Sequence, residues 1–156
     1  LTPKTPPPPP NKKPKGNAAG AYHKAVRYTL ERRQFGAPLA AFQLVQERLA
    51  RMQGQIQGMW LVAWRLTKLL DAGRMTHEQA SLAKAFTTRV EREAVALARE
   101  TLGGNGILSD YLAAKAHADL EAIFTYEGTY DVNALVAGRG ISGIAAIKPA
   151  AAKQQR

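Results

Sequence analysis

The chain is 156 residues long and 46% of its residues are hydrophobic, enough for one globular domain with a buried core. It has no cysteine, which excludes disulfides, thiolate nucleophiles and cysteine-ligated metals. Its formal net charge is +10. Four lysines in residues 1–20 contribute part of this charge, and the rest is dispersed over a body where acidic and basic residues alternate. No recognised nucleic-acid motif accompanies the charge, so we expect no nucleic-acid partner; anionic small molecules explain the excess as well.

The prolines divide the chain into a tail and a body. Seven of the nine prolines lie in the first fourteen residues. Such a segment has no apolar face to bury, so residues 1–17 are predicted to be disordered or polyproline II. Residues 39–148 contain no proline, and because helix interiors exclude proline, this gap favours long helices. We therefore expect one helical domain at 18–148 and a flexible end at 149–156.

The strongest periodic signal begins at Phe42. Its apolar residues follow one another at alternating steps of three and four, which predicts a heptad seam packed in a bundle. The seam consists of Phe42, Val45, Leu49, Met52, Ile56, Met59, Ala63, Leu66 and Leu70. Trp60 and Trp64 flank the seam and are expected to widen the buried face, and Gly73 is expected to end the helix.

Two further helices are predicted on either side of this one. The earlier covers about 18–33, with Tyr22, Val26 and Leu30 on its buried side. The later begins with a capping box, in which Thr76 caps the first turn and Gln79 reaches back to the Thr76 amide. Its expected buried face consists of Leu82, Phe86, Val90, Ala94 and Leu97. Gly103 and Gly104 are expected to end it.

The C-terminal part of the chain predicts two shorter helices. Asp110 could cap a helix that runs to Leu120, and a last helix covers about 129–136. No segment shows the sustained alternation of a β-strand. The fold class is therefore all-α, an antiparallel bundle of four or five helices. No apolar run approaches the roughly 18 residues of a membrane span.

Three segments are unusual for a plain bundle. They are Arg32-Arg33-Gln34-Phe35-Gly36 with Phe42-Gln43 shortly after, Leu102-Gly103-Gly104-Asn105-Gly106, and Tyr126-Glu127-Gly128-Thr129-Tyr130-Asp131. Each has an ordinary structural interpretation by itself. Arginines suit the negative end of a helix dipole, glycines stop helices, and an acid suits a helix N-terminus. The glycine segment is not a dinucleotide fingerprint, because no strand precedes it and its spacing is wrong.

In this order the three segments resemble the C-terminal domain of acyl-CoA dehydrogenases, over roughly residues 20–148. Gly36-Ala37-Pro38-Leu39 and Thr125-Tyr126-Glu127-Gly128-Thr129-Tyr130-Asp131 are most similar to the glutaryl-CoA dehydrogenase branch. The stretch Ile144-Ala145-Ala146-Ile147-Lys148-Pro149-Ala150 is similar to plant-type peroxisomal short-chain acyl-CoA oxidases in that branch. The resemblance implies that the chain takes part in introducing a 2,3-double bond into a short-chain acyl-CoA.

The resemblance implies a catalytic role for Glu127, as the base that removes the α-proton while a β-hydride passes to flavin. A carboxylate in an apolar pocket becomes a stronger base, and Ile123, Phe124 and Tyr126 could supply that pocket. In the family the backbone N–H at this position also helps to polarise the thioester carbonyl. Gly128, which has no side chain, would allow close approach of the substrate.

FAD is the cofactor that the resemblance implies. Arg32 would hold its pyrophosphate through paired hydrogen bonds, and Thr129 and Asp131 begin a helix whose amides suit a flavin phosphate or ring edge. The other positions that match family flavin contacts are Gln34, Phe35, Gln43, Glu100, Thr101, Leu102, Gly103 and Gly104. The residues from Glu100 to Gly104 would contact the adenine end from a neighbouring subunit. Many relatives have an amide in place of Glu100.

The resemblance also implies an acyl-CoA substrate and a homodimer or homotetramer, without a metal, nucleic-acid or membrane partner. The implied compartment is the peroxisome or the mitochondrial matrix, although Lys153-Gln154-Gln155-Arg156 is not a Ser-Lys-Leu-type address. In the family a helical domain and a β-domain precede this segment and complete both pockets. Nothing in the chain resembles them, so we expect this chain alone to bind FAD weakly or not at all and to turn over no substrate.

Two alternatives stay open. One is an inactive helical module that serves oligomerisation. The other is a basic binder of nucleic acid or a membrane surface, which would depend on the lysines of the tail. Within the family, a glutaryl-CoA dehydrogenase is also consistent with the motifs. His23, His77 and His117 are too isolated in the sequence to predict a metal site.

Overall fold

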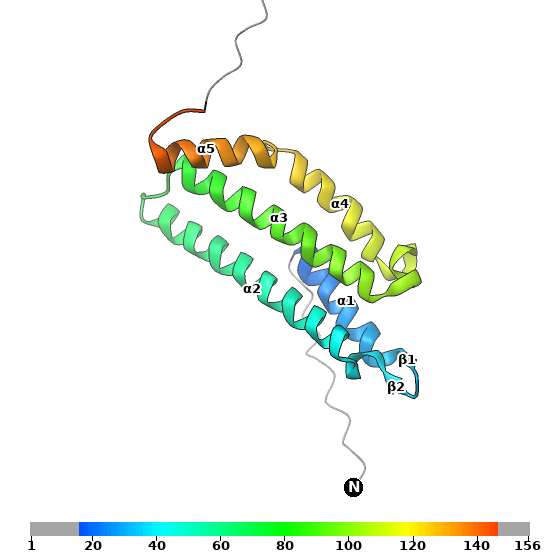
Figure 1. Ribbon diagram of the computed structural model, residues 1–156. Coiled ribbons are helices and arrows are strands. Elements are labelled where there is room, and N and C mark those ends of the chain that lie inside the picture. Colours follow the sequence, from blue (N-terminus) through cyan, green and yellow to red (C-terminus); the bar gives the residue numbers. More distant parts are fainter. Residues whose placement is uncertain (1–15, 147–156) are drawn as a thin grey trace, which may run out of the picture.

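The computed structural model describes residues 16–146 and consists mainly of five α-helices (Figure 1). They are α1 (Asn17–Glu31), α2 (Gln43–Asp71), α3 (His77–Thr101), α4 (Ala113–Thr125) and α5 (Tyr130–Ser142). Two strands of two residues each, β1 (Arg33–Gln34) and β2 (Ala37–Pro38), join α1 to α2. The predicted all-α fold is confirmed. The predicted tail lies outside the described residues except for 16 and 17, and the predicted flexible end lies wholly outside them.

Helix α3 is the centre of the bundle, because it packs against each of the other four helices (Figure 1). Helix α2 runs antiparallel beside it. Helix α1 lies along the C-terminal half of α3, where the Ala18 N–H donates to Glu91. Helices α4 and α5 follow one another along the remaining side, and their junction faces the N-terminal half of α3. The α4–α5 junction is therefore placed by contacts with the middle of the bundle.

The capping box of α3 is present as predicted. The Gln79 N–H donates to Thr76 Oγ1 at 3.3 Å, and the Thr76 N–H donates to Gln79 Oε1 at 3.0 Å. Each of these bonds satisfies an amide that the helix itself leaves without a partner. Helix α3 also ends where predicted, one residue before Leu102 and the glycines.

The core is built largely from small side chains. More than half of its buried hydrophobic residues are alanines, among them Ala25 and Ala98, which are fully buried. Alanine allows helix axes to approach closely, toward the lower end of the ordinary 8–10 Å range. In α1 this changes which face is buried: the alanines and Thr29 point inward, while Leu30 is 46% exposed. The predicted burial of Leu30 was therefore wrong, because small side chains rather than bulky ones fill the buried face of α1.

The heptad seam of α2 is fully buried only in its middle. Met52, Ile56 and Met59 are buried, but further along Leu69 is buried in place of Leu70. A straight α-helix drifts by about 20° per heptad relative to a 3.5-residue repeat. Over the 29 residues of α2 this drift carries the buried stripe away from the predicted seam.

Trp60 and Trp64 do not widen the buried face of α2. They are 50% and 61% exposed, and Leu61 beside them is 63% exposed. At 1.5 Å per residue α2 is about 43 Å long and α1 about 22 Å, so α1 can cover only half of α2. The other half of α2 keeps an uncovered apolar surface formed by Trp60, Leu61 and Trp64.

Three predicted details of the C-terminal half are also corrected. Leu82 and Phe86 of α3 are 52% and 37% exposed, because Ala85 and Thr88 occupy the buried face there. Helix α4 does not begin with an Asp110 cap. A short 3-10 turn, Ser109–Tyr111, precedes it, and Leu112 takes a left-handed conformation at its start. Helices α4 and α5 extend beyond their predicted ends, to Thr125 and Ser142.

A half-buried carboxylate joins α3 to the start of α1. Glu91 accepts a hydrogen bond of 3.2 Å from the Ala18 N–H, in the first turn of α1. Burial raises the pKa of the Glu91 carboxyl, and the hydrogen bond offsets only part of this effect. The folded protein therefore binds the proton more tightly than the unfolded chain. This contribution to stability is complete below the pKa of the unfolded chain and is lost as pH rises through the folded pKa.

Replacement of Glu91 by Gln is expected to remove this pH dependence, because the amide oxygen still accepts from Ala18 but carries no charge. We expect E91Q to be more stable than the parent at pH 7 and equally stable near pH 4, as measured by urea unfolding. The control is E100Q, an exposed position on the same helix, which should not change the pH profile in this way. An E91Q protein that is less stable than the parent at pH 7 would contradict the assignment.

Candidate functional site

The connection between α1 and α2 is a tight hairpin. Strands β1 and β2 pair Arg33 with Pro38 and Gln34 with Ala37. The two residues of the turn, Phe35 and Gly36, have φ values of 51° and 79°, the combination that a type I′ turn requires. Phe35 is not a residue that this conformation favours, and its side chain is 92% exposed. A strained, exposed aromatic on a short hairpin indicates a binding role.

The polar candidates of this region surround the hairpin. Arg32 follows the last turn of α1, and its N–H donates to the Tyr28 carbonyl at 2.8 Å. Its guanidinium is exposed and forms no ion pair within residues 16–146. Gln34 and Gln43 are exposed as well. An arginine without a carboxylate partner, beside two amides and an aromatic ring, fits an anion that carries a planar group.

The glycine segment after α3 presents backbone rather than side chains. Thr101 is buried and its hydroxyl donates to the Leu97 carbonyl, and Leu102 is 2% exposed within the core. Gly103 and Gly104 are exposed, so of these four residues only the glycines offer an accessible surface. The side chains of Thr101 and Leu102 are therefore directed away from any ligand at this surface.

The segment is fixed by two contacts. A Cβ on Gly106 would lie 2.1 Å from the Arg99 carbonyl oxygen, so only glycine fits there. The Asn105 side-chain amide donates to the Tyr28 hydroxyl at 2.9 Å, which ties the segment to α1.

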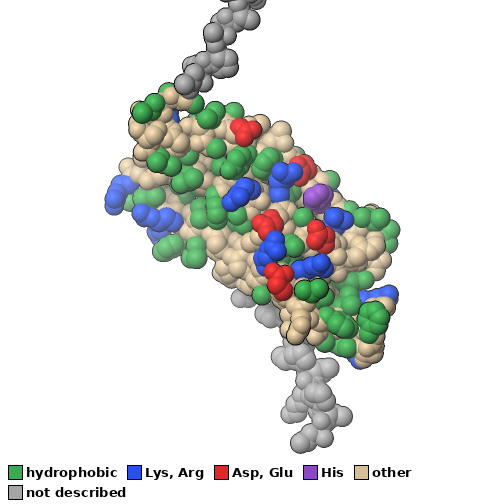
Figure 2. Space-filling view, viewed as in Figure 1, with side chains coloured by type: hydrophobic (Ala, Val, Ile, Leu, Met, Phe, Trp, Pro, Cys, Tyr) green, Lys and Arg blue, Asp and Glu red, His purple; other side chains and the backbone are tan. Residues whose placement is uncertain are grey.

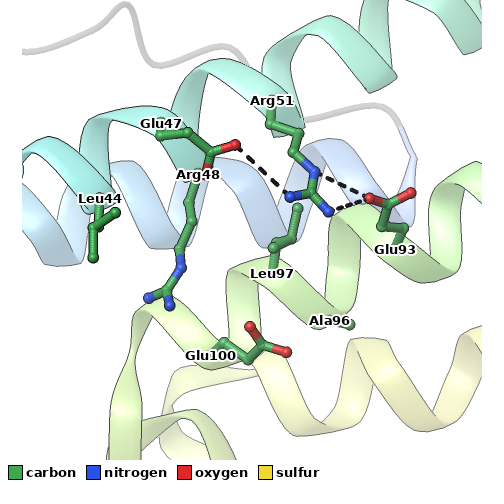
Figure 3. Close-up of a pocket in the computed structure, with 8 residues that line it drawn as sticks. All are labelled: Leu44, Glu47, Arg48, Arg51, Glu93, Ala96, Leu97 and Glu100. Atoms are coloured by element: carbon green, nitrogen blue, oxygen red, sulfur yellow. Dashed lines mark hydrogen bonds and ion pairs between the residues drawn. The ribbon is translucent and has the colours of Figure 1, made fainter.

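Glu100 lies in a groove between the N-terminal half of α2 and the C-terminal half of α3 (Figure 3). The cavity has a volume of about 400 Å³ and is lined by Leu44, Glu47, Arg48, Arg51, Glu93, Ala96, Leu97 and Glu100. Arg51 bridges Glu47 and Glu93, so its charge is already neutralised. Figure 2 shows acidic and basic side chains side by side on the face of the molecule that it presents. Arg48 extends toward Glu100 without a hydrogen bond between them (Figure 3). The free carboxylate of Glu100 suits a hydrogen-bond donor, such as an amino group, rather than a phosphate.

Glu127 lies in the junction between α4 and α5 and has a φ of 56°. This left-handed conformation costs a non-glycine residue on the order of 1–3 kcal/mol and persists only where the surroundings enforce it. Its side chain is exposed in the chain as described. The predicted apolar pocket from Ile123 and Phe124 does not form, because Ile123 packs against the core and Phe124 stacks on Tyr130. Tyr126 is itself 54% exposed.

Two side chains that the sequence analysis did not single out hold this junction. Lys84 of α3 donates to the carbonyls of Phe124, Tyr126 and Gly128 at 3.3, 2.8 and 2.7 Å. Asn133 of α5 donates to the carbonyls of Gly128 and Thr129 at 2.8 and 3.1 Å. The available signal was weak: Lys84 is the one charged residue in the stretch 79–88.

The structure requires a glycine at position 128 for a different reason from the expected approach of a substrate. Its φ is 85°, and a Cβ at this position would lie 2.9 Å from Asn133 Nδ2. The missing side chain therefore makes room for the amide of Asn133, which the chain itself provides. Thr129 caps α5 by accepting from the Val132 N–H, and Asp131 is exposed in the first turn. The first amides of α5 have no partner within the helix and can bind an anionic or polar group.

A single chain does not bring all these residues together. Lys84, which contacts the junction that contains Glu127, lies about 24 Å from Glu100 along α3. Helix α1 runs from Glu91 toward the glycine segment, so Arg32 and the hairpin lie at the same end as Glu100 (Figure 1). The candidates form two groups, the hairpin with the glycine segment and the α4–α5 junction. Within residues 16–146, no three acidic or histidine side chains cluster as metal ligands would. None of the helices in this part of the chain has both the length and the hydrophobicity of a membrane span.

Comparison with known proteins settles the family. The profile of the acyl-CoA dehydrogenase C-terminal domain matches residues 14–142. The chain belongs to the acyl-CoA dehydrogenase family. Among curated members it is 33% identical over 121 residues to a 3-(aryl)acrylate reductase from Clostridium sporogenes, a match that covers 78% of this chain and 32% of that protein.

Solved structures of the acyl-CoA dehydrogenase family agree with the fold. Glutaryl-CoA dehydrogenase from Mycobacterium smegmatis superposes with a TM-score of 0.82 and 34% identity, over 85% of this chain and 34% of that one. A structure of a glutaryl-CoA dehydrogenase from the same organism in complex with FADH2 has the same TM-score and 33% identity, over 85% of this chain and 34% of that one. The chain thus spans about a third of the length of the relatives that it matches.

Substitution of Gly128 by Ala is expected to destabilise the domain by roughly 1–3 kcal/mol, because the new Cβ meets Asn133 and the φ is unfavourable. The control is G138A, on the exposed side of α5, where a Cβ meets nothing within 4 Å. Alanine there should be neutral or stabilising by roughly 0.5–1 kcal/mol. Thermal unfolding of both variants measures the difference, and equal stability would contradict the role given to Gly128.

Proposed function

We propose that the chain forms the C-terminal part of an FAD-dependent acyl-CoA oxidoreductase and supplies its catalytic base, Glu127. The observation that carries this proposal is the backbone of Glu127. It is strained, presented at the surface, and held from behind by Lys84 and Asn133. A carboxylate built in this way is positioned for a ligand outside the bundle rather than for packing within it.

The proposed chemistry uses two groups of the same residue. The Glu127 carboxylate takes the proton from the α-carbon of the acyl thioester, and the Glu127 N–H donates to the thioester carbonyl, where charge develops. When FAD is bound, it supplies the acceptor for the hydride that leaves the β-carbon. The product is the 2,3-unsaturated thioester. Since the Glu127 side chain is exposed in this chain, the apolar cover that strengthens it as a base must come from the ligands or from other segments.

The residues present fit FAD in two places, one at the C-terminal end of α3 near the hairpin and the other near the α4–α5 junction. Arg32, with no carboxylate partner among the described residues, and the exposed ring of Phe35 suit a pyrophosphate beside a planar group. Glu100 suits the amino group of an adenine, as an acceptor. Thr129 and the first amides of α5 suit the flavin near Glu127. These places lie at opposite ends of α3, which supports a flavin site that is completed by a second copy of the chain.

The apolar surface of α2 suits this second copy. Trp60, Leu61 and Trp64 form a continuous patch on the half of α2 that α1 does not cover. Exposed patches with two tryptophans mark protein interfaces. A homodimer or homotetramer would bury it. Oligomerisation and catalysis are then linked, so the inactive oligomerisation module is distinguished from the enzyme by the flavin chemistry alone.

The direction and specificity of the reaction belong to the same proposal. One relative is named as a reductase of 3-(aryl)acrylate, and in a reduction the acid form of Glu127 would return the proton to the α-carbon. We favour oxidation of a short-chain acyl-CoA, on the motifs shared with the glutaryl-CoA dehydrogenase branch. The peroxisome or the mitochondrial matrix is the compartment that we propose.

The base is tested by substitution of Glu127 in the full-length flavoprotein. Anaerobic addition of butyryl-CoA should bleach the flavin band near 450 nm in the parent. E127Q should slow this bleaching by at least about 10³-fold, since the amide cannot take a proton. The control is D71N, an exposed acid at the end of α2 that pairs with Lys68 and has no role in the proposed site. Bleaching at the parental rate in E127Q would refute the assignment.

The interface is tested by sedimentation velocity. The parent is expected to sediment as a dimer or tetramer. The double variant W60Q/W64Q should shift toward the monomer, because it removes the apolar area that the interface buries. R65Q changes an exposed neighbour on the same helix and should leave the assembly unchanged. A monomeric parent, or a double variant that assembles as the parent does, would contradict the proposed interface.

A further inference from the structure

The donors of Lys84 are all directed to one segment of backbone. An ammonium group has three N–H donors, and three carbonyls, those of Phe124, Tyr126 and Gly128, accept them. The side chain is half-buried, and within residues 16–146 it forms no ion pair. A lysine used only to solvate a helix face would keep its head group in water. Lys84 instead holds the end of α4 and the junction that contains Glu127.

Two of these three hydrogen bonds are accepted by the residues that flank Glu127 in the sequence. The carbonyls of the residues immediately before and after it both point at Lys84. Asn133 holds the second of them from the opposite helix, at 2.8 Å. Glu127 thus lies between two residues whose carbonyl groups are held in place, and this arrangement imposes its left-handed backbone conformation.

The direction of one peptide group follows from these contacts. The Tyr126 carbonyl and the Glu127 N–H belong to one planar trans peptide, in which the C=O and N–H point to opposite sides. Because the carbonyl points toward α3, the N–H points away from α3 and out of the bundle. This N–H has no backbone acceptor within residues 16–146. Among the described residues it is therefore an unused donor on the side of the junction that faces away from α3.

The positive charge of Lys84 also polarises the peptide group between Tyr126 and Glu127. A hydrogen bond from an ammonium draws electron density toward the carbonyl oxygen, and the amide N–H of the same peptide becomes a stronger donor. The effect is greatest where water does not screen it, as at a half-buried ammonium.

We propose that Lys84 is a positioning residue that orients and polarises the Tyr126–Glu127 peptide, so that the Glu127 N–H binds the thioester carbonyl while the carboxylate takes the α-proton. This inference rests on the proposed function for its catalytic part. Its structural part, the fixing of the junction by the ammonium, stands on the three contacts alone. The two parts are therefore tested separately.

The structural part is tested by NMR on the 156-residue chain. In K84M the ¹⁵N order parameters of residues 126–129 should fall from about 0.85 to below about 0.6, while those of α2 and the middle of α3 remain unchanged. The matched control is K68M, which removes an exposed lysine of α2 that pairs with Asp71 and not with the junction. Unchanged order in the junction of folded K84M overturns this part. If K84M does not fold, K84R, which keeps the charge but not the three-way geometry, is measured in its place.

The catalytic part is tested in the full-length flavoprotein with butyryl-CoA. K84M should slow flavin reduction by about tenfold to a hundredfold, less than the loss of a direct oxyanion donor, with the FAD content unchanged. The infrared stretch of the thioester carbonyl in bound 2-butenoyl-CoA should move back toward its frequency in water. A merely structural tie would change stability without moving this frequency. K84R, with the charge but altered geometry, should fall between K84M and the parent in both measurements.

The outcomes separate the two proposals. If the parent flavin is not reduced by any acyl-CoA, the proposed function fails, and the NMR measurement still decides whether Lys84 fixes the junction. If the parent is reduced and K84M matches it in rate and carbonyl frequency, the function stands and the positioning role of Lys84 is overturned. If both measurements change and K68M is normal, Lys84 acts as proposed.

Discussion

The arrangement of this domain depends on α3, the one helix that every other helix contacts. A helix in that position has buried residues along most of its length, from Ala85 to Thr101. Two of its own side chains fix neighbouring elements. The Glu91 carboxylate accepts a hydrogen bond from the start of α1, and the Lys84 ammonium donates to the α4–α5 junction. The two groups of candidate site residues lie at separate places along α3, and this separation is the observation that supports the proposed sharing of one site between two copies.

Much of this could be predicted from the sequence, and the failures share one cause. The capping box at Thr76, the end of α3 at the glycines and the all-helical class depend on local chemistry, which a sequence shows directly. Burial depends on which neighbour covers a face. Leu30 and Leu82 are large and correctly spaced, but alanines occupy the buried contacts of their helices, and Trp64 lies on the half of α2 that α1 does not cover. The hairpin was missed because strands of two residues show no periodicity.

The candidate site was also predictable only in part. Its residues were predicted from the resemblance of three motifs to a family, and no periodic pattern would have selected Glu127. What the sequence could not provide is the support behind that residue, since Lys84 and Asn133 come from two other helices. The strain at Glu127 and at Phe35 likewise appears only in the backbone, because neither residue type is one that favours a positive φ.

The alanine contacts have a consequence for how such a domain can diversify. Helices that meet through methyl groups leave no space for larger side chains, so substitutions at these contacts would force the axes apart and displace every junction at once. Change is tolerated instead at exposed loop positions that, unlike Gly106 and Gly128, need neither a positive φ nor a close contact. Descendants of this bundle can therefore acquire new ligands by altering a few loop residues while the scaffold beneath them stays fixed.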